Sequence, residues 1–342
     1  MSLRRPKFTN EYVINLLKTR YNRNICKIKQ LPSYDDQNFY IEDESGGKFV
    51  LKVTHLENSS FEILECQNTI MNLLKNKGIT SSYPIPTTDG TLTLRNTCFG
   101  LRLLNFVEGK LYREVNVLND KLLKNLGVFI GSIDNYLLEY DNPHVHREFL
   151  WSLKNSVDNI KNNLKYIDNP NNRDIVSYYV SEYEDLIKPE IIELLPKSII
   201  HMDLNDMNLI LDNKDNVGVI DFDDILYTTT INELAINIAY FMQLPASYVY
   251  PLTPIKVASH IVAGYHSVHH ISDDEIRVIY PLAIIRICVS VSMSSYRHSK
   301  EGDNDHITIC QENSWRLLHY LKDNGITPDN VRARLRRACR SE

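Results

Sequence analysis

The polar residues best suited to chemistry lie in one stretch of the chain, residues 198–224. Its apolar runs are short and rich in β-branched residues, which predicts a hairpin of two buried strands and a short strand before it. Polar residues stand at the ends of these strands: His201, Asp203, Asn208, Asp221, Asp223 and Asp224. This placement predicts a set of side chains that can act together.

The spacing of these residues indicates phosphoryl transfer to a hydroxyl. Asp203 and Asn208 are five residues apart, and Asp221 follows the next apolar strand in an Asp-Phe pair. The reaction needs one carboxylate to orient the hydroxyl and accept its proton. It also needs hard oxygen ligands, such as a carboxamide and a second carboxylate, to hold Mg²⁺ against the triphosphate.

A charged hairpin with solvated acids is the alternative interpretation. It does not explain why the acids cluster at the ends of strands that are wholly apolar. His201 is a different case, and we expect a structural role for it. Its ring is predicted to pack behind the loop with a backbone hydrogen bond, and not to transfer protons.

Composition limits the class of protein. The chain has 342 residues, which is long for one domain and suits two lobes; 43% of them are apolar, and 38 basic and 43 acidic residues give a net charge of −5. No basic stripe is present, so nucleic acid is not an expected partner. Six cysteines without a Cys-x-x-Cys pair indicate free thiols. With no signal-peptide pattern and no run of 18 apolar residues, we expect a cytoplasmic protein without a membrane partner.

The predicted elements divide the chain into two regions. Residues 1–106 carry the pattern of a small β-rich lobe, with strands at 25–31, 38–42, 48–54, 91–95 and 98–106 and helices at 10–21 and 58–77. Residues 107–342 are mainly helical, with helices at 118–140, 148–163, 172–188, 230–241, 307–322 and 328–338. Thr230-Ile-Asn-Glu233 is predicted to be a capping box, Ser272 to Glu275 opens another helix, and Pro281 starts or kinks an apolar one.

Lys52 is the candidate cation of the first region. It lies in Phe49-Val-Leu-Lys-Val-Thr54, where alternation puts it on one face of a strand between apolar neighbours. A buried amine needs an anionic partner, and a nucleotide phosphate would serve, with a helical glutamate holding the amine. Glu65 is the predicted glutamate, with Glu62 behind it. A solvent-facing lysine on an edge strand is the alternative.

Two connections of the first region are candidates for nucleotide contacts. The turn 32–36 lies where a kinase lobe covers the phosphates; it has no glycine, but Ser33 and the backbone near Asp35 could donate, unless this is a plain Asx-type turn. The run 101–109 is the predicted lobe boundary. A base could pair with backbone groups of Asn105 and Val107 there, although an ordinary strand-to-helix connection would have the same sequence pattern.

Together these residues resemble the aminoglycoside phosphotransferase and choline kinase-like superfamily, whose members are relatives of protein kinases. The resemblance extends from the Lys52 strand to the helical C-terminal half. It implies an α+β, two-lobed protein-kinase-like fold, with Asp203 as the catalytic base, Asn208 and Asp221 as Mg²⁺ ligands and Lys52 on the nucleotide phosphates. By spacing from Leu73-Leu74, the glutamate position of some members falls on Gln67.

Within that superfamily, residues 31–39, 220–224 and 233–240 look like the hydroxylysine kinases, cytoplasmic phosphotransferases that use GTP. This implies a small-molecule kinase with Mg²⁺, with GTP or ATP as donor, and with 5-hydroxy-L-lysine as acceptor. Homoserine, choline, ethanolamine and aminoglycosides remain alternative acceptors. A catalytically dead kinase fold that binds nucleotide or a protein is a further alternative, which the presence of all four residues above argues against.

The acids near the predicted site exceed what one or two Mg²⁺ ions need. Such a surplus suits a substrate with ammonium groups, so Asp206 and Asp224 are candidate substrate contacts. The carboxylate of an amino acid substrate would need a basic anchor, for which Arg286 and Arg297 are candidates by their position in the helical half. A solvated acidic rim is an equally good interpretation of these charges.

Overall fold

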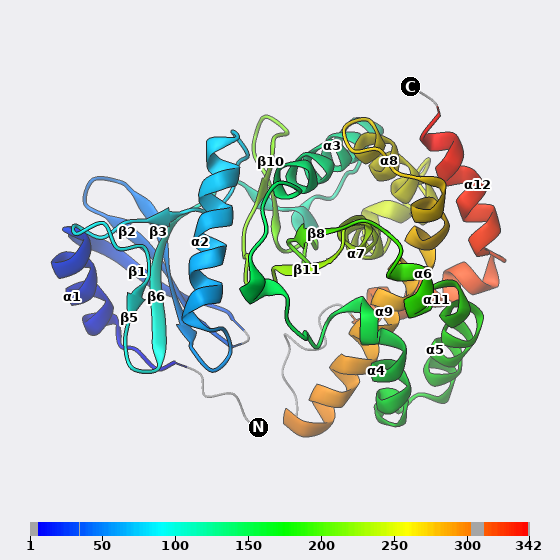
Figure 1. The fold of residues 1–342 in the computed structure, drawn as a ribbon, viewed down its shortest axis with the longest axis horizontal. Helices are drawn as coiled ribbons and strands as arrows, with labels where there is room; N and C mark the ends of the chain where they lie inside the picture. The colour runs from blue at the N-terminus through cyan, green and yellow to red at the C-terminus, as the bar shows by residue number, and fades with distance from the viewer. Residues whose placement is uncertain (1–5, 34, 302–310, 341–342) are drawn as a thin grey trace. The chain divides into compact units, whose positions relative to one another are not determined.

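A computed structural model describes residues 6–33, 35–301 and 311–340 (Figure 1). The chain forms two compact units. Unit 1 contains Met1–Gly109, Asn142–Val145 and Gly218–Ile225, and unit 2 contains the remaining residues. Unit 1 therefore includes two later segments of the chain, which a division after residue 106 would assign to the helical region.

Unit 1 is built on one antiparallel sheet with the strand order β1-β2-β3-β6-β4, and β5 pairs with the first part of β6. The strands are β1 (Ile25–Leu31), β2 (Gln37–Asp43), β3 (Lys48–His55), β4 (Pro84–Ile85), β5 (Leu94–Arg95) and β6 (Phe99–Asn105). The helices are α1 (Asn10–Tyr21), α2 (Phe61–Asn76) and the 3₁₀ turn η2 (Pro143–Val145). The predicted strands are present, and β4 is an additional short one.

The two faces of this sheet have different neighbours. Leu51 and Val53 of β3 share one hydrophobic core with Val13 and Leu17 of α1. Because successive strand residues point to opposite faces, Lys52 lies on the other face. That face is covered by α2, since a Cβ built on Gly100 of β6, the residue paired with Thr54, would meet the Leu64 side chain. Lys52 is thus enclosed between the sheet and α2.

Unit 2 is mainly helical (Figure 1). Its α-helices are α3 (Asp120–Leu137), α4 (Ser156–Asn163), α5 (Pro170–Tyr183), α6 (Pro189–Ile192), α7 (Ile231–Phe241), α8 (Pro254–His266), α9 (Asp273–Glu301), α11 (Gln311–Asp323) and α12 (Pro328–Ala338). The predicted helix at 148–163 is α-helical only from Ser156, after the 3₁₀ turn η3 (Leu153–Asn155). Residues 307–310 of another predicted helix lie outside the described residues.

Short strands in unit 2 support the loop that carries Asp203. They are β7 (Lys110–Leu111), β8 (Lys197–Ile200), β9 (Leu209–Leu211) and β11 (Leu226–Thr229), and β10 (Val217–Val219) leads back into unit 1. β8 pairs with β11 in antiparallel register, and β9 pairs with β7. Sequence patterns did not indicate β11, because its four residues, Leu-Tyr-Thr-Thr, are too few to establish a period.

Helix α9 forms the centre of unit 2. It is one helix from Asp273 to Glu301 and contains Pro281 in its interior, where the sequence suggested a start or a kink. The helix opens where Ser272 to Glu275 predicted, with the Ser272 N–H donating to the Glu275 carboxylate and the Glu275 N–H donating to the Ser272 hydroxyl. The helix is long and apolar enough to cross a membrane, but 89% of its most apolar window is buried inside the protein, as in a core helix.

Glycines bring α3 and α8 into close contact. A Cβ at Gly127 of α3 would lie 2.0 Å from the Ile261 carbonyl oxygen, and one at Gly264 of α8 would lie 2.0 Å from that of Lys124. Both positions have neighbouring backbone where a side chain would stand, so no rotamer change could make room. Gly127 and Gly264 therefore allow α3 and α8 to pack backbone against backbone.

Candidate active site

The Asp203 carboxylate lies in the loop after β8 and is fixed from three sides. Its Oδ2 accepts hydrogen bonds from the side-chain amides of Asn205 at 2.9 Å and Asn208 at 2.8 Å. Its Oδ1 is 3.3 Å from the Arg286 guanidinium of α9. The Asp203 side chain is 22% exposed. Donors on both oxygens and a neighbouring cation favour the ionised form, which a base requires.

The same contacts set the direction of the Asn208 side chain. Its Nδ2 donates to the carboxylate and the backbone carbonyl of Asp203, which leaves the amide oxygen Oδ1 for another partner. The Asn205 Oδ1 accepts from the backbone N–H of Met207 and of Asn208, so the turn between the two predicted site residues is internally bonded. Asn205 was not among the predicted site residues, although its position between Asp203 and Asn208 indicates that it lies in the same loop.

His201 is buried, as expected for a structural residue. The Asp203 N–H points to its Nδ1 at 3.4 Å. Between them, Met202 has a φ of +71°, a backbone conformation that costs free energy for a residue with a side chain. The loop that presents Asp203 is therefore held in a strained conformation and needs support from surrounding groups.

Glu233 of α7 provides that support. Its Oε2 accepts from the backbone N–H of His201 at 2.5 Å and of Met202 at 3.1 Å. The capping box predicted for Thr230 and Glu233 is wrong, because the Glu233 carboxylate faces the loop and the Thr230 hydroxyl bonds to Ser198. Burial raises the pKa of Glu233 to about 7, although the two N–H groups lower it.

Arg286 was predicted to anchor the substrate carboxylate, but its contacts are with protein groups. Its guanidinium is buried, contacts Asp203, and donates to the Trp151 carbonyl oxygen at 3.2 Å. It also lies over the Trp151 and Tyr240 rings, at 5.3 and 5.8 Å from their centroids. Arg297, eleven residues further along α9, lies over the same Trp151 ring at 5.5 Å from its centroid. The Arg286 charge is thus directed at the Asp203 carboxylate.

Asp206 differs from its predicted role as a substrate contact. It is buried, and its carboxylate pairs with the Arg113 Nε at 3.3 Å, while its backbone carbonyl accepts from the Arg113 N–H. Burial raises the pKa of Asp206, although Arg113 lowers it. A carboxylate already neutralised by a protein cation is a poor contact for a substrate ammonium group.

Unit 1 contains a second group of charges, centred on Lys52. Its Nζ lies 2.7 Å from Asp221, 2.5 Å from Asp223 and 3.5 Å from Asp36. The Lys52 side chain is 7% exposed. Burial lowers the pKa of Lys52, but the three carboxylates together raise it above its ordinary value. Lys52 is therefore a charged group held in the interior by carboxylates, and its predicted contact with nucleotide phosphates stays a prediction.

Asp221 and Asp223 follow β10 and belong to unit 1. Asp221 has a φ of +64°, and its side chain is 44% exposed, more than that of Asp223 at 33%. Asp223 also lies 3.6 Å from the guanidinium of Arg102, which is opposite Lys52 in the β3–β6 register. Arg102 was not among the predicted site residues, because a single arginine in an apolar strand carries no motif.

Glu65 is not the partner of Lys52 in this structure. Its carboxylate accepts from the Asn68 amide at 3.1 Å, and among the described residues it forms no ion pair. Gln67, two residues further along α2, donates instead to the Asp223 backbone carbonyl at 3.3 Å. The carboxylate expected from α2 is replaced by that of Asp36, which precedes β2.

Asn105, Val107 and Ser33 are the other predicted nucleotide contacts, and they differ in the hydrogen bonds that their backbone groups make. The Asn105 N–H donates to the Tyr83 carbonyl oxygen, and its side chain accepts from the Tyr83 N–H, so Asn105 is occupied within unit 1. Within the described part of the chain, no hydrogen bond engages the backbone of Val107. Ser33 lies half-buried in the β1–β2 connection. Val107 and Ser33 stay predictions, whereas the Asn105 N–H is committed elsewhere.

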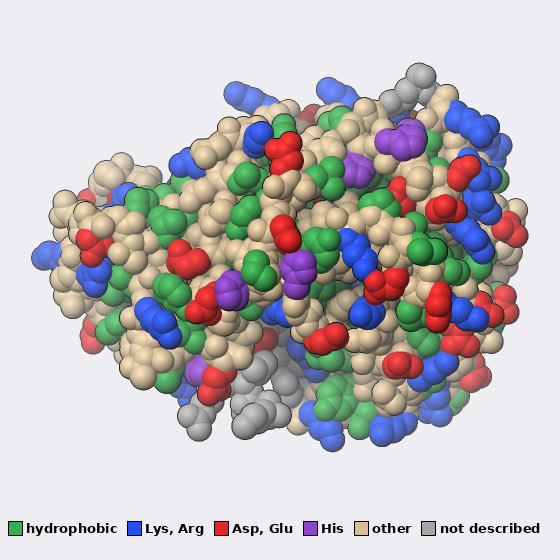
Figure 2. Space-filling view, in the orientation of Figure 1, with side chains coloured by type: hydrophobic (Ala, Val, Ile, Leu, Met, Phe, Trp, Pro, Cys, Tyr) green, Lys and Arg blue, Asp and Glu red, His purple; other side chains and the backbone are tan. Residues whose placement is uncertain are grey.

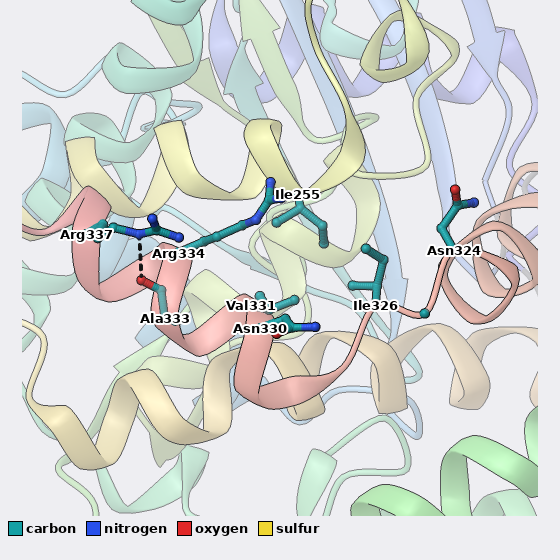
Figure 3. A pocket seen from close by; sticks show the side chains of 9 residues that line it. Ile255, Asn324, Ile326, Asn330, Val331, Ala333, Arg334 and Arg337 are labelled. Carbon is teal, nitrogen blue, oxygen red and sulfur yellow. Dashed lines mark hydrogen bonds between the residues drawn. The ribbon is translucent and has the colours of Figure 1, made fainter.

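A cavity of about 430 Å³ lies elsewhere in unit 2, beside α12 and α8 (Figure 3). It is lined by Ile255, Asn324, Gly325, Ile326, Asn330, Val331, Ala333, Arg334 and Arg337. Figure 2 shows Lys and Arg side chains gathered over α12, with Asp and Glu among them. The lining contains no carboxylate and none of the predicted site residues, so this cavity is not a candidate for phosphoryl transfer.

Comparison with known families gives a match over much of the chain. Residues 27–253 match the phosphotransferase enzyme family designated APH. The matched region covers more than half of the chain and includes Lys52, Asp203, Asn208 and Asp221. The protein therefore belongs to this phosphotransferase family.

Individual proteins are similar to this chain over most of its length. The chain is 28% identical to a hydroxylysine kinase of Danio rerio over 94% of its length and 93% of the relative. It is also 28% identical to a hydroxylysine kinase of Xenopus laevis over 94% of its length and 91% of the relative. A solved amicoumacin kinase in complex with AMP-PNP and Ca²⁺ has a TM-score of 0.69 and 16% identity, covering 93% of this chain and 94% of that one. The fold is kinase-like and α+β, as predicted, and the protein is a phosphotransferase.

We expect the Glu233 contact to be required for turnover. Glu233→Ala removes the acceptor of two buried N–H groups, which costs about 1–3 kcal/mol for each unsatisfied group and releases the strained loop. Turnover should fall at least roughly tenfold, because Asp203 loses its fixed position. Glu233→Gln keeps an acceptor oxygen and serves as the matched control, expected to remain within a few-fold of the wild type. Equal turnover of all three proteins would contradict this role.

Proposed function

We propose that the protein is a hydroxylysine kinase, which transfers the γ-phosphate of GTP or ATP to the hydroxyl of 5-hydroxy-L-lysine. The observation that carries this proposal is the similarity to hydroxylysine kinases along nearly the whole chain. The similarity covers 94% of this chain, so it extends over both units. The proposal on the donor and the acceptor therefore rests on these relatives and is open to direct measurement.

In this proposal Asp203 is the general base. Its ionised carboxylate accepts the proton of the acceptor hydroxyl while the hydroxyl oxygen attacks the γ-phosphorus and the nucleoside diphosphate leaves. The amides of Asn205 and Asn208 and the Arg286 guanidinium support this role, since they orient the carboxylate and favour its charge. Little other covalent chemistry is needed, because phosphoryl transfer depends mainly on positioning and on stabilising charge.

The donor set suits a magnesium ion. Asn208 offers an amide oxygen, because its nitrogen is engaged by Asp203, and Asp221 offers a carboxylate with an exposed side chain. Hard oxygen ligands of this kind are those that Mg²⁺ prefers. We propose both residues as ligands; when bound, the ion would neutralise charge that develops on the phosphates. Lys52 would contact the phosphates with its buried ammonium group.

One acid of the predicted set is proposed to contact the acceptor. Asp206 and Asp223 pair with protein cations, so the number of acids alone does not argue for an ammonium-bearing acceptor. Asp224 remains our proposed contact for the side-chain ammonium group of hydroxylysine. Such a contact would be charge-assisted and would reject acceptors that leave the carboxylate unpaired.

The proposed base is tested by Asp203→Asn. The change keeps the shape of the side chain and removes its basicity, so turnover should fall roughly 10²–10⁴-fold. Unfolding temperature and nucleotide affinity should stay close to those of the wild type, which shows that the fold is intact. Near-normal kcat in this variant would exclude Asp203 as the base.

The proposed metal ligands are tested by Mg²⁺ titrations of activity. Asp221→Ala removes a charged ligand and should abolish activity or raise the Mg²⁺ requirement strongly. Asn208→Ala should have a smaller effect on the Mg²⁺ requirement, because it removes a neutral ligand. Titration curves that coincide with that of the wild type in both variants would rule out this assignment.

The acceptor is tested with purified protein, Mg²⁺ and each of GTP and ATP. Hydroxylysine should be the best acceptor among hydroxylysine, homoserine, choline, ethanolamine and an aminoglycoside. Lysine is the matched control, because it lacks only the hydroxyl and should compete without accepting phosphate. A preference for another acceptor would overturn the hydroxylysine assignment, and no transfer to any acceptor would favour a non-catalytic kinase fold.

A further inference from the structure

Lys52 needs a counter-charge that persists when the nucleotide binds. A buried ammonium group without a carboxylate is costly, and a lysine without a fixed partner is free to rotate away from the phosphates. Two of its three carboxylates, Asp221 and Asp223, come from the segment after β10. Under the proposed function, on which this inference rests, Asp221 serves the metal and is drawn away from Lys52.

Asp36 is the third carboxylate that pairs with Lys52 among the described residues, and it is the one that does not come from the segment after β10. The side chains of both are only 7% exposed, and their charged atoms are 3.5 Å apart. The Thr54 hydroxyl donates to the Asp36 Oδ2 at 2.9 Å and fixes the direction of the carboxylate. Asp36 is therefore a buried and oriented group, and not part of a solvated turn.

Strand register explains this arrangement. Gln37 of β2 is paired with Val53 of β3, and Asn38 with Lys52. The next position outward puts Asp36 opposite Thr54, which shares a strand face with Lys52. The contact thus depends on the sheet itself. It does not depend on the position of α2, where Glu65 bonds to Asn68 and Gln67 bonds to the Asp223 carbonyl.

The charges around Lys52 are consistent with this role. Two cations, Lys52 and Arg102, face three carboxylates in unit 1. Asp223 lies between the two cations, Asp36 faces Lys52, and Asp221 has the most exposed side chain of the three. If Asp221 turns to a metal ion, Asp36 and Asp223 still balance the charges of Lys52 and Arg102.

We propose that Asp36 is the residue that positions Lys52 for the nucleotide phosphates, in place of a glutamate on α2. Asp36 also ends the turn 32–36, so the same contact joins the turn predicted to cover the phosphates to the lysine that binds them. Asp36 is a positioning residue, since it acts through Lys52. Nucleotide affinity therefore depends on a carboxylate from the β1–β2 connection.

The test is nucleotide binding to the full-length protein, measured by calorimetry with GTP, ATP and Mg²⁺ and without any acceptor. Asp36→Asn should weaken binding of the nucleotide that the wild type prefers by roughly 10- to 100-fold, the effect of losing a charge-assisted contact. In turnover assays the nucleotide KM should rise while the acceptor KM stays unchanged. A loss of folded protein alone would lower kcat and leave both KM values unaltered.

Matched variants separate the possible outcomes. Asp35→Asn makes the same change one residue earlier and should bind nucleotide like the wild type, and Glu65→Gln should do so as well. Wild-type affinity of Asp36→Asn, or an equal loss in Glu65→Gln, would overturn the proposal. If Asp36→Asn does not fold, the Thr54→Val variant is tested in its place, because this change removes only the hydrogen bond to the Asp36 carboxylate. Thr54→Val should weaken nucleotide binding several-fold. Unchanged nucleotide affinity in this variant would also overturn the proposal. Binding is independent of transfer, so failure of every acceptor would count against the proposed function alone.

Discussion

The conformation of the loop that carries Asp203 depends on one buried carboxylate, which accepts hydrogen bonds from two backbone N–H groups. The loop before Asp203 includes a residue with positive φ, and a strained loop persists only when its surroundings determine it. Glu233 does this through His201 and Met202. Because most residues of α7 are buried, the position of the proposed base is tied to a helix in the core of unit 2. The amides of the loop then only need to orient the carboxylate.

In unit 1, buried carboxylates stabilise two buried cations. Lys52 and Arg102 lie side by side on adjacent strands, between a sheet and a helix that exclude most water. Two neighbouring cations repel, and each alone would be costly to bury. The carboxylates around them make the arrangement stable, and they also keep the amine charged for an anionic ligand. In both units, buried carboxylates fix the positions of proposed site residues, and more exposed side chains are proposed to take part in the reaction.

Patterns within a few residues were predictable from the sequence. The five-residue spacing of Asp203 and Asn208 corresponds to a direct contact, because one short loop joins them. The alternation around Lys52 correctly gave its enclosed face. The capping box at Thr230 failed because the same Ser/Thr-x-x-Glu pattern also suits a carboxylate that bonds to a distant loop. Local pattern cannot distinguish the two uses.

Long-range partners were beyond the reach of sequence patterns. Asp206 looked like a spare acid in the motif, but its partner Arg113 lies in a connection far upstream, after β7. The Asp36 contact with Lys52 requires the register of β2 against β3, which a shift of one residue would destroy. Glu65 was predicted from its place on α2 to hold Lys52, but its carboxylate bonds to Asn68 of the same helix. In each case tertiary geometry, and not residue type, selected the partner.

The composition of unit 1 has a consequence for synthesis of the chain on the ribosome. Its sheet is complete once β6 has been made, but Val219 still has to bond to the Thr80 carbonyl and the Ser82 N–H. Asp221 and Asp223 are added just after it, so a nascent N-terminal region holds Lys52 with Asp36 as its carboxylate from that region. Unit 1 therefore finishes folding only after much of unit 2 has emerged, and a fragment cut after residue 109 would leave the lysine and arginine of its interior short of counter-charge.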